Sequence, residues 1–342
     1  MTAVTGGLIQ AADYNNLVTG TDNSTLSTTT ANLGLIWGNG YGRYGYGQDT
    51  SYIRPVVIGD IGRGQEWANL DRVLAATINH QSGPDSYIGP ALAVFRPGSI
   101  IRPTDAFAPY IATAFADTGL VYANSAAPAN RTTHLAGWGH NGSRSLQFVQ
   151  TLTFDTADSA RYFFNAGGKI NLSFSLNGGP TTARNAFWHN ICADAGTIEI
   201  GYQNTRKTTV TNHSRYEALD SGNGGFWAGV NSQSKTHFKQ YSESGIGAYG
   251  GAYGGAYGTG SETLDFIQVA IRMLGDSGAN GGVGNIVEIT TTFENGLTLT
   301  PEKQDTISGA ATASLVVAGL SNTSLSTNSW GSITFNGTVS AV

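Results

Sequence analysis

Apolar and polar residues alternate along two segments in the middle of the chain, which predicts two strands. The alternating apolar-side positions are Leu146, Phe148, Gln150, Leu152 and Phe154 in the first segment, and Ile170, Leu172, Phe174 and Leu176 in the second. Because successive side chains of a strand point to opposite faces, this period of two predicts strands that are buried on one face only.

An Asn-Ala-Gly-Gly corner, preceded by two phenylalanines, lies between these strands at Phe163 to Gly168. Glycine adopts positive φ without steric cost, and a glycine pair after an asparagine suits a tight turn. We therefore predict a structural turn at Asn165, Gly167 and Gly168.

Further strand-like segments continue to the end of the chain, at 197–202, 226–230, 263–274, 285–293, 313–320 and 332–339. Asn-Gly pairs at 177, 223, 280 and 295 are typical hairpin signals. The predicted fold class is mainly β, with an antiparallel β-sandwich at 144–342, one helix near 184–195, and a short helical or extended N-terminal attachment region.

The first 83 residues contain two predicted amphipathic helices, near 10–18 and 64–80. Short helices need tertiary partners to persist, and two of them cannot bury all the apolar surface of this region against each other. Docking helices and helices that cover their own core remain alternatives. On the docking hypothesis, the assembly interface consists of Tyr14, Leu17, Trp67, Leu70, Leu74 and Ile78.

Six of the nine prolines lie between residues 84 and 143, which predicts an extended, loop-rich connector. His134 and His140 end this segment, but a metal site needs a third ligand and none is near. We predict ordinary turn or surface histidines and no metal.

Two segments are dense in glycine and tyrosine. Trp37 to Gln48 lacks the Lys-Ser/Thr and the βαβ context of a phosphate-binding loop, so a tight turn that packs tyrosines at an interface is predicted. An Ala-Tyr-Gly tract within 245–260 predicts a long exposed loop. Its tyrosines, Tyr249, Tyr253 and Tyr257, either form an adhesive or intersubunit surface or contact no partner.

Composition excludes several classes of function. Charged residues make up 12% of the chain, the net charge is −5 and no basic cluster occurs, which argues against nucleic-acid binding. Cys192 is the single cysteine, so no intrachain disulfide can form. The apolar runs are too short to span a bilayer and the first residues lack signal-peptide features, which predicts a protein that stays soluble in a cytoplasm until it assembles.

The order of several motifs resembles a family of virion structural proteins of tailed phages, common among cyanophages and often labelled tail fibre-like. The matching elements are the opening segment 9–17, Gly45-Tyr46-Gly47-Gln48, His80-Gln81-Ser82-Gly83 and the corner Phe163 to Gly168. The resemblance implies a non-enzymatic part of the tail, baseplate or neck, without cofactors, assembled in the host cytoplasm. It also implies other virion proteins as partners, and a trimer or hexamer.

Phage appendages also include proteins that cleave or bind glycans. Cleavage needs two carboxylates at a fixed separation, and the candidates in the β region are Asp155, Asp158, Asp194, Glu199, Glu217 and Asp220. Binding of a host surface glycan would suit exposed aromatics such as Trp188, Trp227 and Tyr249. A structural role, a glycan-binding role and a hydrolase remain alternatives.

Overall fold

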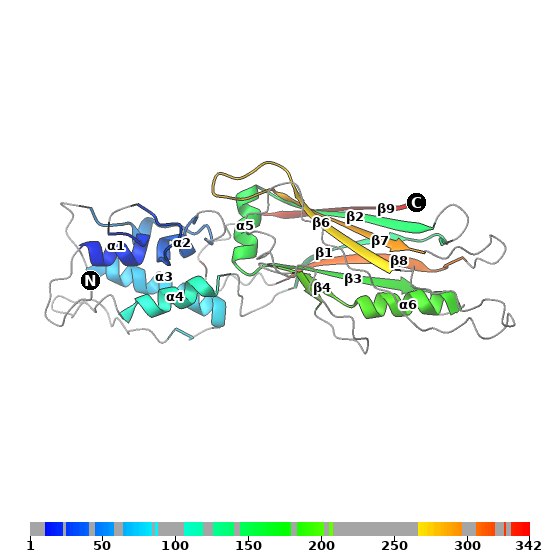
Figure 1. The fold of residues 1–342 in the computed structure, drawn as a ribbon, viewed down its shortest axis with the longest axis horizontal. Coiled ribbons are helices and arrows are strands. Elements are labelled where there is room, and N and C mark those ends of the chain that lie inside the picture. Colours follow the sequence, from blue (N-terminus) through cyan, green and yellow to red (C-terminus); the bar gives the residue numbers. More distant parts are fainter. Residues whose placement is uncertain are drawn as a thin grey trace.

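The computed structural model describes residues 11–22, 25–40, 45–57, 64–83, 86–87, 106–118, 126–139, 144–178, 183–201, 205–207, 266–295, 306–318, 325 and 330–342. They form a helical lobe and a β-sandwich lobe placed end to end, with one helix between them (Figure 1). The predicted fold class, mainly β with a helical N-terminal region and a C-terminal antiparallel sandwich, is confirmed.

The helical lobe packs short helices against one long helix, α3 (Gly64–Ser82). Around it lie α1 (Ala11–Thr19), α2 (Leu33–Trp37), the 3₁₀ helix η1 (Ser51–Ile53) and α4 (Ala108–Ala116). The predicted helices near 10–18 and 64–80 correspond to α1 and α3. Asn15 ties α1 to the η1 segment, because its amide donates to the Val56 carbonyl and accepts from the Val56 N–H, both at 2.9 Å.

The proline-rich segment 84–143 is not simply an extended connector, and that prediction was wrong for its described parts. α4 belongs to the helical lobe, and Pro109 lies in its first turn, where a missing N–H costs nothing. A strand, β1 (Ala126–His134), belongs to the sandwich. It is an edge strand with a register irregularity between Ala126 and Ala129, the context in which a sheet tolerates a residue such as Pro128.

Two antiparallel sheets form the sandwich. In the first sheet the strand order is β1, β8 (Ala310–Ala318), β3 (Lys169–Asn177), β4 (Ile198–Ile200) and β5 (Thr205–Lys207). In the second sheet it is β6 (Phe266–Leu274), β7 (Ile286–Glu294), β2 (Ser145–Phe154) and β9 (Ile333–Ala341). The predicted strand at 226–230 lies outside the described residues.

β2 and β3, the strands predicted from the alternating segments around Phe148 and Leu172, lie in different sheets and are joined by a helix, α5 (Ala157–Asn165). Their alternation is reproduced in the burial of every second side chain. Of the Asn-Gly pairs, Asn280-Gly281 lies in the loop of the β6–β7 hairpin, whereas Asn177-Gly178 follows β3 on the way to α6 (Ala183–Ala195), not to a paired strand. The pair at 223–224 lies outside the described residues.

The core of the sandwich is aromatic at the end far from the helical lobe. Trp188 of α6 stacks on Phe293 of β7, with ring centroids 5.7 Å apart, and its edge meets Trp138 at 4.8 Å. The amide of Gln150, which is fully buried, donates to the Ala313 carbonyl across the two sheets at 3.1 Å. α6 therefore closes the sandwich beside β3.

Candidate functional site

Helix α5 lies between the two lobes (Figure 1). Thr156 caps its first turn by accepting from the Ser159 N–H at 3.0 Å. Phe163 and Phe164 pack on Phe154 of β2, with centroid distances of 5.2 and 6.2 Å. On its other side, α5 contacts the helical lobe through Arg161, Tyr162 and Asn165. Ala166, in the turn that follows α5, also contacts that lobe.

Five contacts between segments distant in sequence build this inter-lobe junction, and the first two join one lobe to the other. The Asn165 amide donates to the Gly45 carbonyl at 3.0 Å, and His80 Nε2 lies 3.0 Å from the Ala166 carbonyl oxygen. The His80 ring meets Tyr46 edge-on at 5.9 Å. Gln81 donates to the Tyr46 hydroxyl at 2.6 Å and to the Ala114 carbonyl of α4 at 2.8 Å.

Burial sets the charge state of His80. Because Nε2 of His80 faces a carbonyl oxygen, that nitrogen must carry a proton. Burial lowers the pKa of His80, and the bond to the Ala166 carbonyl opposes this shift only in part. The imidazole is therefore neutral at neutral pH and serves as a hydrogen-bond donor rather than as a charge.

The segment of the helical lobe that meets α5 approaches it through glycine. Gly47 has φ of +68°, and a Cβ there would lie 2.5 Å from the Tyr162 ring. The Tyr162 hydroxyl donates to the Asn39 side-chain oxygen at 3.1 Å, and the Arg161 guanidinium donates to the Asn39 carbonyl. The glycines of the predicted tyrosine-packing turn thus permit close contact between the lobes.

The turn after α5 combines all three residues of the predicted corner. Asn165 is fully buried, and Gly167 has φ of +85°. A Cβ on Gly168 would lie 2.6 Å from the Phe163 ring. The sequence indicated a turn here, but it carried no signal that the turn contacts residues 120 positions away.

Carboxylates at the start of α5 hold the neighbouring loops. Asp158 accepts from the backbone N–H groups of Asn280 and Gly282, each at 2.9 Å. Asp155 accepts from the Ser332 N–H at 3.0 Å. Of the other candidate acids for glycan cleavage, Glu199 forms an ion pair with Lys169 at 3.4 Å. The Asp194 side chain, Glu217 and Asp220 lie outside what the structure describes.

The residues predicted to form an assembly interface lie inside this chain's own helical lobe. Each of the six is at most 7% exposed, and they join one core cluster: Tyr14, Leu17, Trp67, Leu70, Leu74 and Ile78. The assignment of these side chains to another subunit was wrong, because α2 and α4 supply the cover that two helices alone could not. The Tyr14 and Trp67 rings, for example, pack edge to face at 5.4 Å.

The residues that the sequence offered for sugar stacking, adhesion or metal binding form no such site among the described residues. Trp188 is fully buried and cannot stack on a sugar. Tyr249, Tyr253, Tyr257 and His140 lie outside the described residues, which hold no cluster of three potential metal ligands. None of the described helices combines the length and apolar character needed to cross a bilayer.

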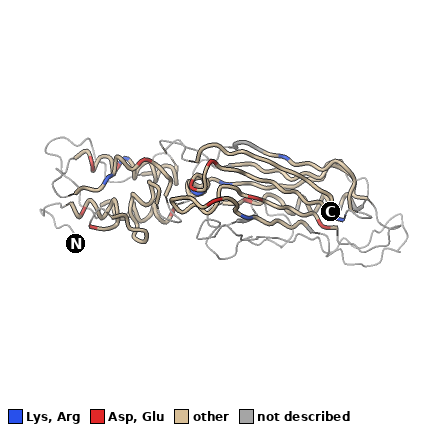
Figure 2. Tube along the Cα trace, turned by 90° about the horizontal axis from the view of Figure 1, so that it is seen from above, with Lys and Arg blue, Asp and Glu red and all other residues tan. Residues whose placement is uncertain are grey.

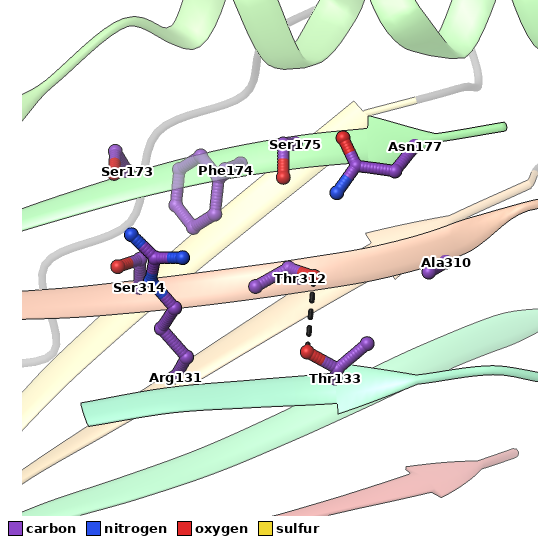
Figure 3. Close-up of a pocket in the computed structure, with 9 residues that line it drawn as sticks. All are labelled: Arg131, Thr133, Ser173, Phe174, Ser175, Asn177, Ala310, Thr312 and Ser314. Atoms are coloured by element: carbon purple, nitrogen blue, oxygen red, sulfur yellow. Dashed lines mark hydrogen bonds between the residues drawn. The ribbon is translucent and has the colours of Figure 1, made fainter. Parts of the chain in front are cut away.

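A shallow polar depression, with a volume of about 340 Å³, lies on the outer face of the first sheet (Figure 3). The strand register arranges its side chains in three rows across β1, β8 and β3. The rows are Arg131, Ser314 and Ser173; then Thr133, Thr312 and Ser175; then Ala310 and Asn177.

Charge is sparse around this depression. Charged residues are scattered along the described chain (Figure 2). Three strand cations have described side chains: Lys169 pairs with Glu199, and Arg272 with Glu288 at 2.5 Å. Arg131 is exposed and forms no ion pair with a described carboxylate. The depression thus presents hydroxyls, an amide and one available guanidinium.

The chain matches no family model, no curated protein and no solved structure.

Proposed function

We propose that this chain is a non-enzymatic structural component of a tailed-phage virion, placed in the tail, baseplate or neck. Its task would be to hold a β-sandwich in a fixed orientation on a helical base that attaches to the particle. The proposal rests on the resemblance to tail fibre-like virion proteins and on where the motifs of that resemblance lie in the fold.

The convergence of three motifs at one junction is the observation that supports the proposal most. Gly45 meets Asn165, His80 meets Ala166, and Gln81 meets Tyr46. These residues come from the Gly-Tyr-Gly-Gln, His-Gln-x-Gly and Phe-Phe-Asn-Ala-Gly-Gly elements. The motifs on which the resemblance depends therefore serve the connection between lobes, which is what a structural part of an assembly needs.

The fourth motif supports the helical base itself. Asn15, from the opening segment 9–17, exchanges two hydrogen bonds with Val56. Since Trp67 and its neighbours are buried within the lobe, attachment would use other surfaces of the base. We propose that the chain assembles as a homo-oligomer, with a trimer or hexamer suggested by the resemblance, beside other virion proteins in the host cytoplasm.

Antibody labelling of purified particles tests this proposal. A phage that encodes the chain should carry it in every intact virion, and gold-labelled antibodies should decorate one place on the tail, baseplate or neck. Particles that lack the chain but remain complete and infectious would refute it.

A second measurement separates this function from glycan cleavage. The purified full chain should release no reducing ends from host polysaccharide over hours, at pH 5 to 8. The matched variant Asp155→Asn should behave as the native chain does, because an asparagine side-chain oxygen can still accept the backbone hydrogen bond from Ser332. Release by the native chain that Asp155→Asn abolishes would make the protein a hydrolase.

A further inference from the structure

The depression on the outer face of the first sheet has the chemistry of a ligand site. Its volume of about 340 Å³ falls within the usual range of small-molecule sites, roughly 300–1,000 Å³. Same-face residues of a strand are about 7 Å apart, so its three rows extend roughly 14 Å along the strands. That length suits an extended ligand better than a single ion.

The hydrogen-bonding groups of the depression favour a ligand with many hydroxyls. Ser173, Ser175, Ser314 and Asn177 offer donors and acceptors, and the structure assigns none of their side chains a partner among the described residues. Thr133 and Thr312 bond to each other at 3.1 Å, which orients both hydroxyls at the centre (Figure 3). A ligand with closely spaced groups that both donate and accept hydrogen bonds would supply partners for these side chains.

Arg131 adds a requirement for negative charge. Its guanidinium lies at one end of the depression, in the row of Ser314 and Ser173. A guanidinium binds a carboxylate through two parallel hydrogen bonds, and no described acid lines the depression to compete for it. A single cation is too little for a nucleic acid, whose binding neutralises several phosphates.

A protein partner fits this face poorly. Protein interfaces have cores enriched in aromatic residues and methionine and depleted of serine. Among the described residues that line the depression, Phe174 is the only aromatic one, and it is buried, with its ring against Phe293 in the core. We propose that this face binds an acidic oligosaccharide, with Arg131 on a uronate carboxylate and the serine and asparagine side chains on sugar hydroxyls.

This inference does not depend on the virion role. Since the described lining offers no exposed aromatic ring for a sugar to stack on, one site should bind weakly, with a dissociation constant in about the millimolar range. Repeated copies in an assembly would raise the avidity, as linked sites do when they can bind together.

The test titrates the full-length chain with trigalacturonate and with maltotriose, a neutral control, by ligand-observed saturation-transfer NMR. Trigalacturonate should bind at least about 10-fold more tightly than maltotriose, because a charge-assisted bidentate pair is added. Arg131→Gln should remove that difference. Ser175→Val, which fills the middle row with a residue that strands favour, should weaken both ligands.

Arg272→Gln is the matched control, since it removes an exposed strand arginine from the other sheet. It should change the affinity for trigalacturonate by less than about twofold. Unchanged melting curves establish that each variant is folded. The proposal is overturned if neither sugar binds, if both bind equally, or if Arg131→Gln retains the native affinity. Binding of single-stranded DNA that needs Arg131, without binding of trigalacturonate, would also overturn it.

Discussion

Gly168→Ala should destabilise the protein through one identifiable clash. The added Cβ would lie 2.6 Å from Cε2 and Cζ of Phe163. That ring is fully buried and held between Phe154 and Phe164, at 5.2 and 4.7 Å, so it cannot turn away. Overpacking of this kind costs about 1–3 kcal/mol. The melting temperature should fall by about 2–12 °C, at roughly 2–4 °C per kcal/mol for a domain of this size.

A double-mutant cycle with Phe163→Leu identifies the cause. The smaller side chain costs stability on its own, because it leaves a cavity. It also removes the clash, so Gly168→Ala should be nearly neutral in its presence, with a coupling energy of about 1 kcal/mol or more. Gly167→Ala, which tests only the cost of positive φ, should lose about 1–2 kcal/mol whether or not Phe163 is changed.

Thermal unfolding of the full chain, followed by far-UV circular dichroism, measures all four forms of the cycle. A Gly168→Ala protein that melts within 1 °C of the native chain would contradict the geometry of the corner. Strict additivity with Phe163→Leu would show that the cost arises elsewhere, for example in the hydrogen bond from the Gly168 N–H to the Phe163 carbonyl, which measures 2.9 Å.

Three further predictions concern single side chains. Because the folded pKa of His80 is lowered below its ordinary 6.5, the unfolded chain binds the extra proton first, so stability should fall as the pH drops below about 6.5. His80→Gln should lessen that dependence in urea unfolding at pH 7.5 and 5.5, and an unchanged dependence would contradict it. Burial raises the pKa of Cys192 to about 12, so Ellman's reagent should label the native thiol at least about 100-fold more slowly than in urea. Thr156→Ala should cost about 1 kcal/mol through loss of the α5 cap, whereas Thr156→Ser should keep most of the stability.

Periodicity in the sequence predicted those elements whose burial follows a simple repeat. Leu172 and Phe148 lie in strands that are buried on alternate residues, and such strands can be predicted from the sequence without any tertiary information. α5 escaped prediction because it is nine residues long and almost every residue in it is buried, on one side by the sandwich and on the other by the helical lobe. Asp158, Arg161 and Asn165 do share one side of it at helical spacing, but nine residues are too few for that amphipathic pattern to mark a helix clearly.

The wrong interface assignment has a related cause. Trp67 and Leu70 form an apolar face on α3, and a sequence cannot state which segment will cover it. The segment that covers it includes α4, which lies in the proline-rich stretch that was predicted to contain no helix. Phe107, directly before α4, packs on Trp67 with ring centroids 5.8 Å apart. Pro109 is compatible with that helix only because it occupies the first turn.

The polar character of the junction bears on what the two lobes can do together. An apolar contact alone is non-directional and tolerates sliding. Here Asn165 and His80 are buried, and their hydrogen bonds to Gly45 and Ala166 form at only one relative orientation of the two lobes. A change in the angle between the lobes would leave these buried groups unpaired, at about 1–3 kcal/mol for each.

That cost selects one orientation of the sandwich on its base. The boundary of the N-terminal region does not lie at residue 83. α4 lies beyond that residue and still belongs to the helical lobe, where its Ala114 carbonyl accepts a hydrogen bond from Gln81. Removal of residues 1–83 would leave α4 without the helices on which it packs and would expose the side of α5 that contacts the helical lobe. A cut between 118 and 126 would leave the helical lobe whole, but it would still separate Asn165 from Gly45. The lobes are thus two packing units that share one set of buried hydrogen bonds, and we expect them to unfold together rather than in two steps.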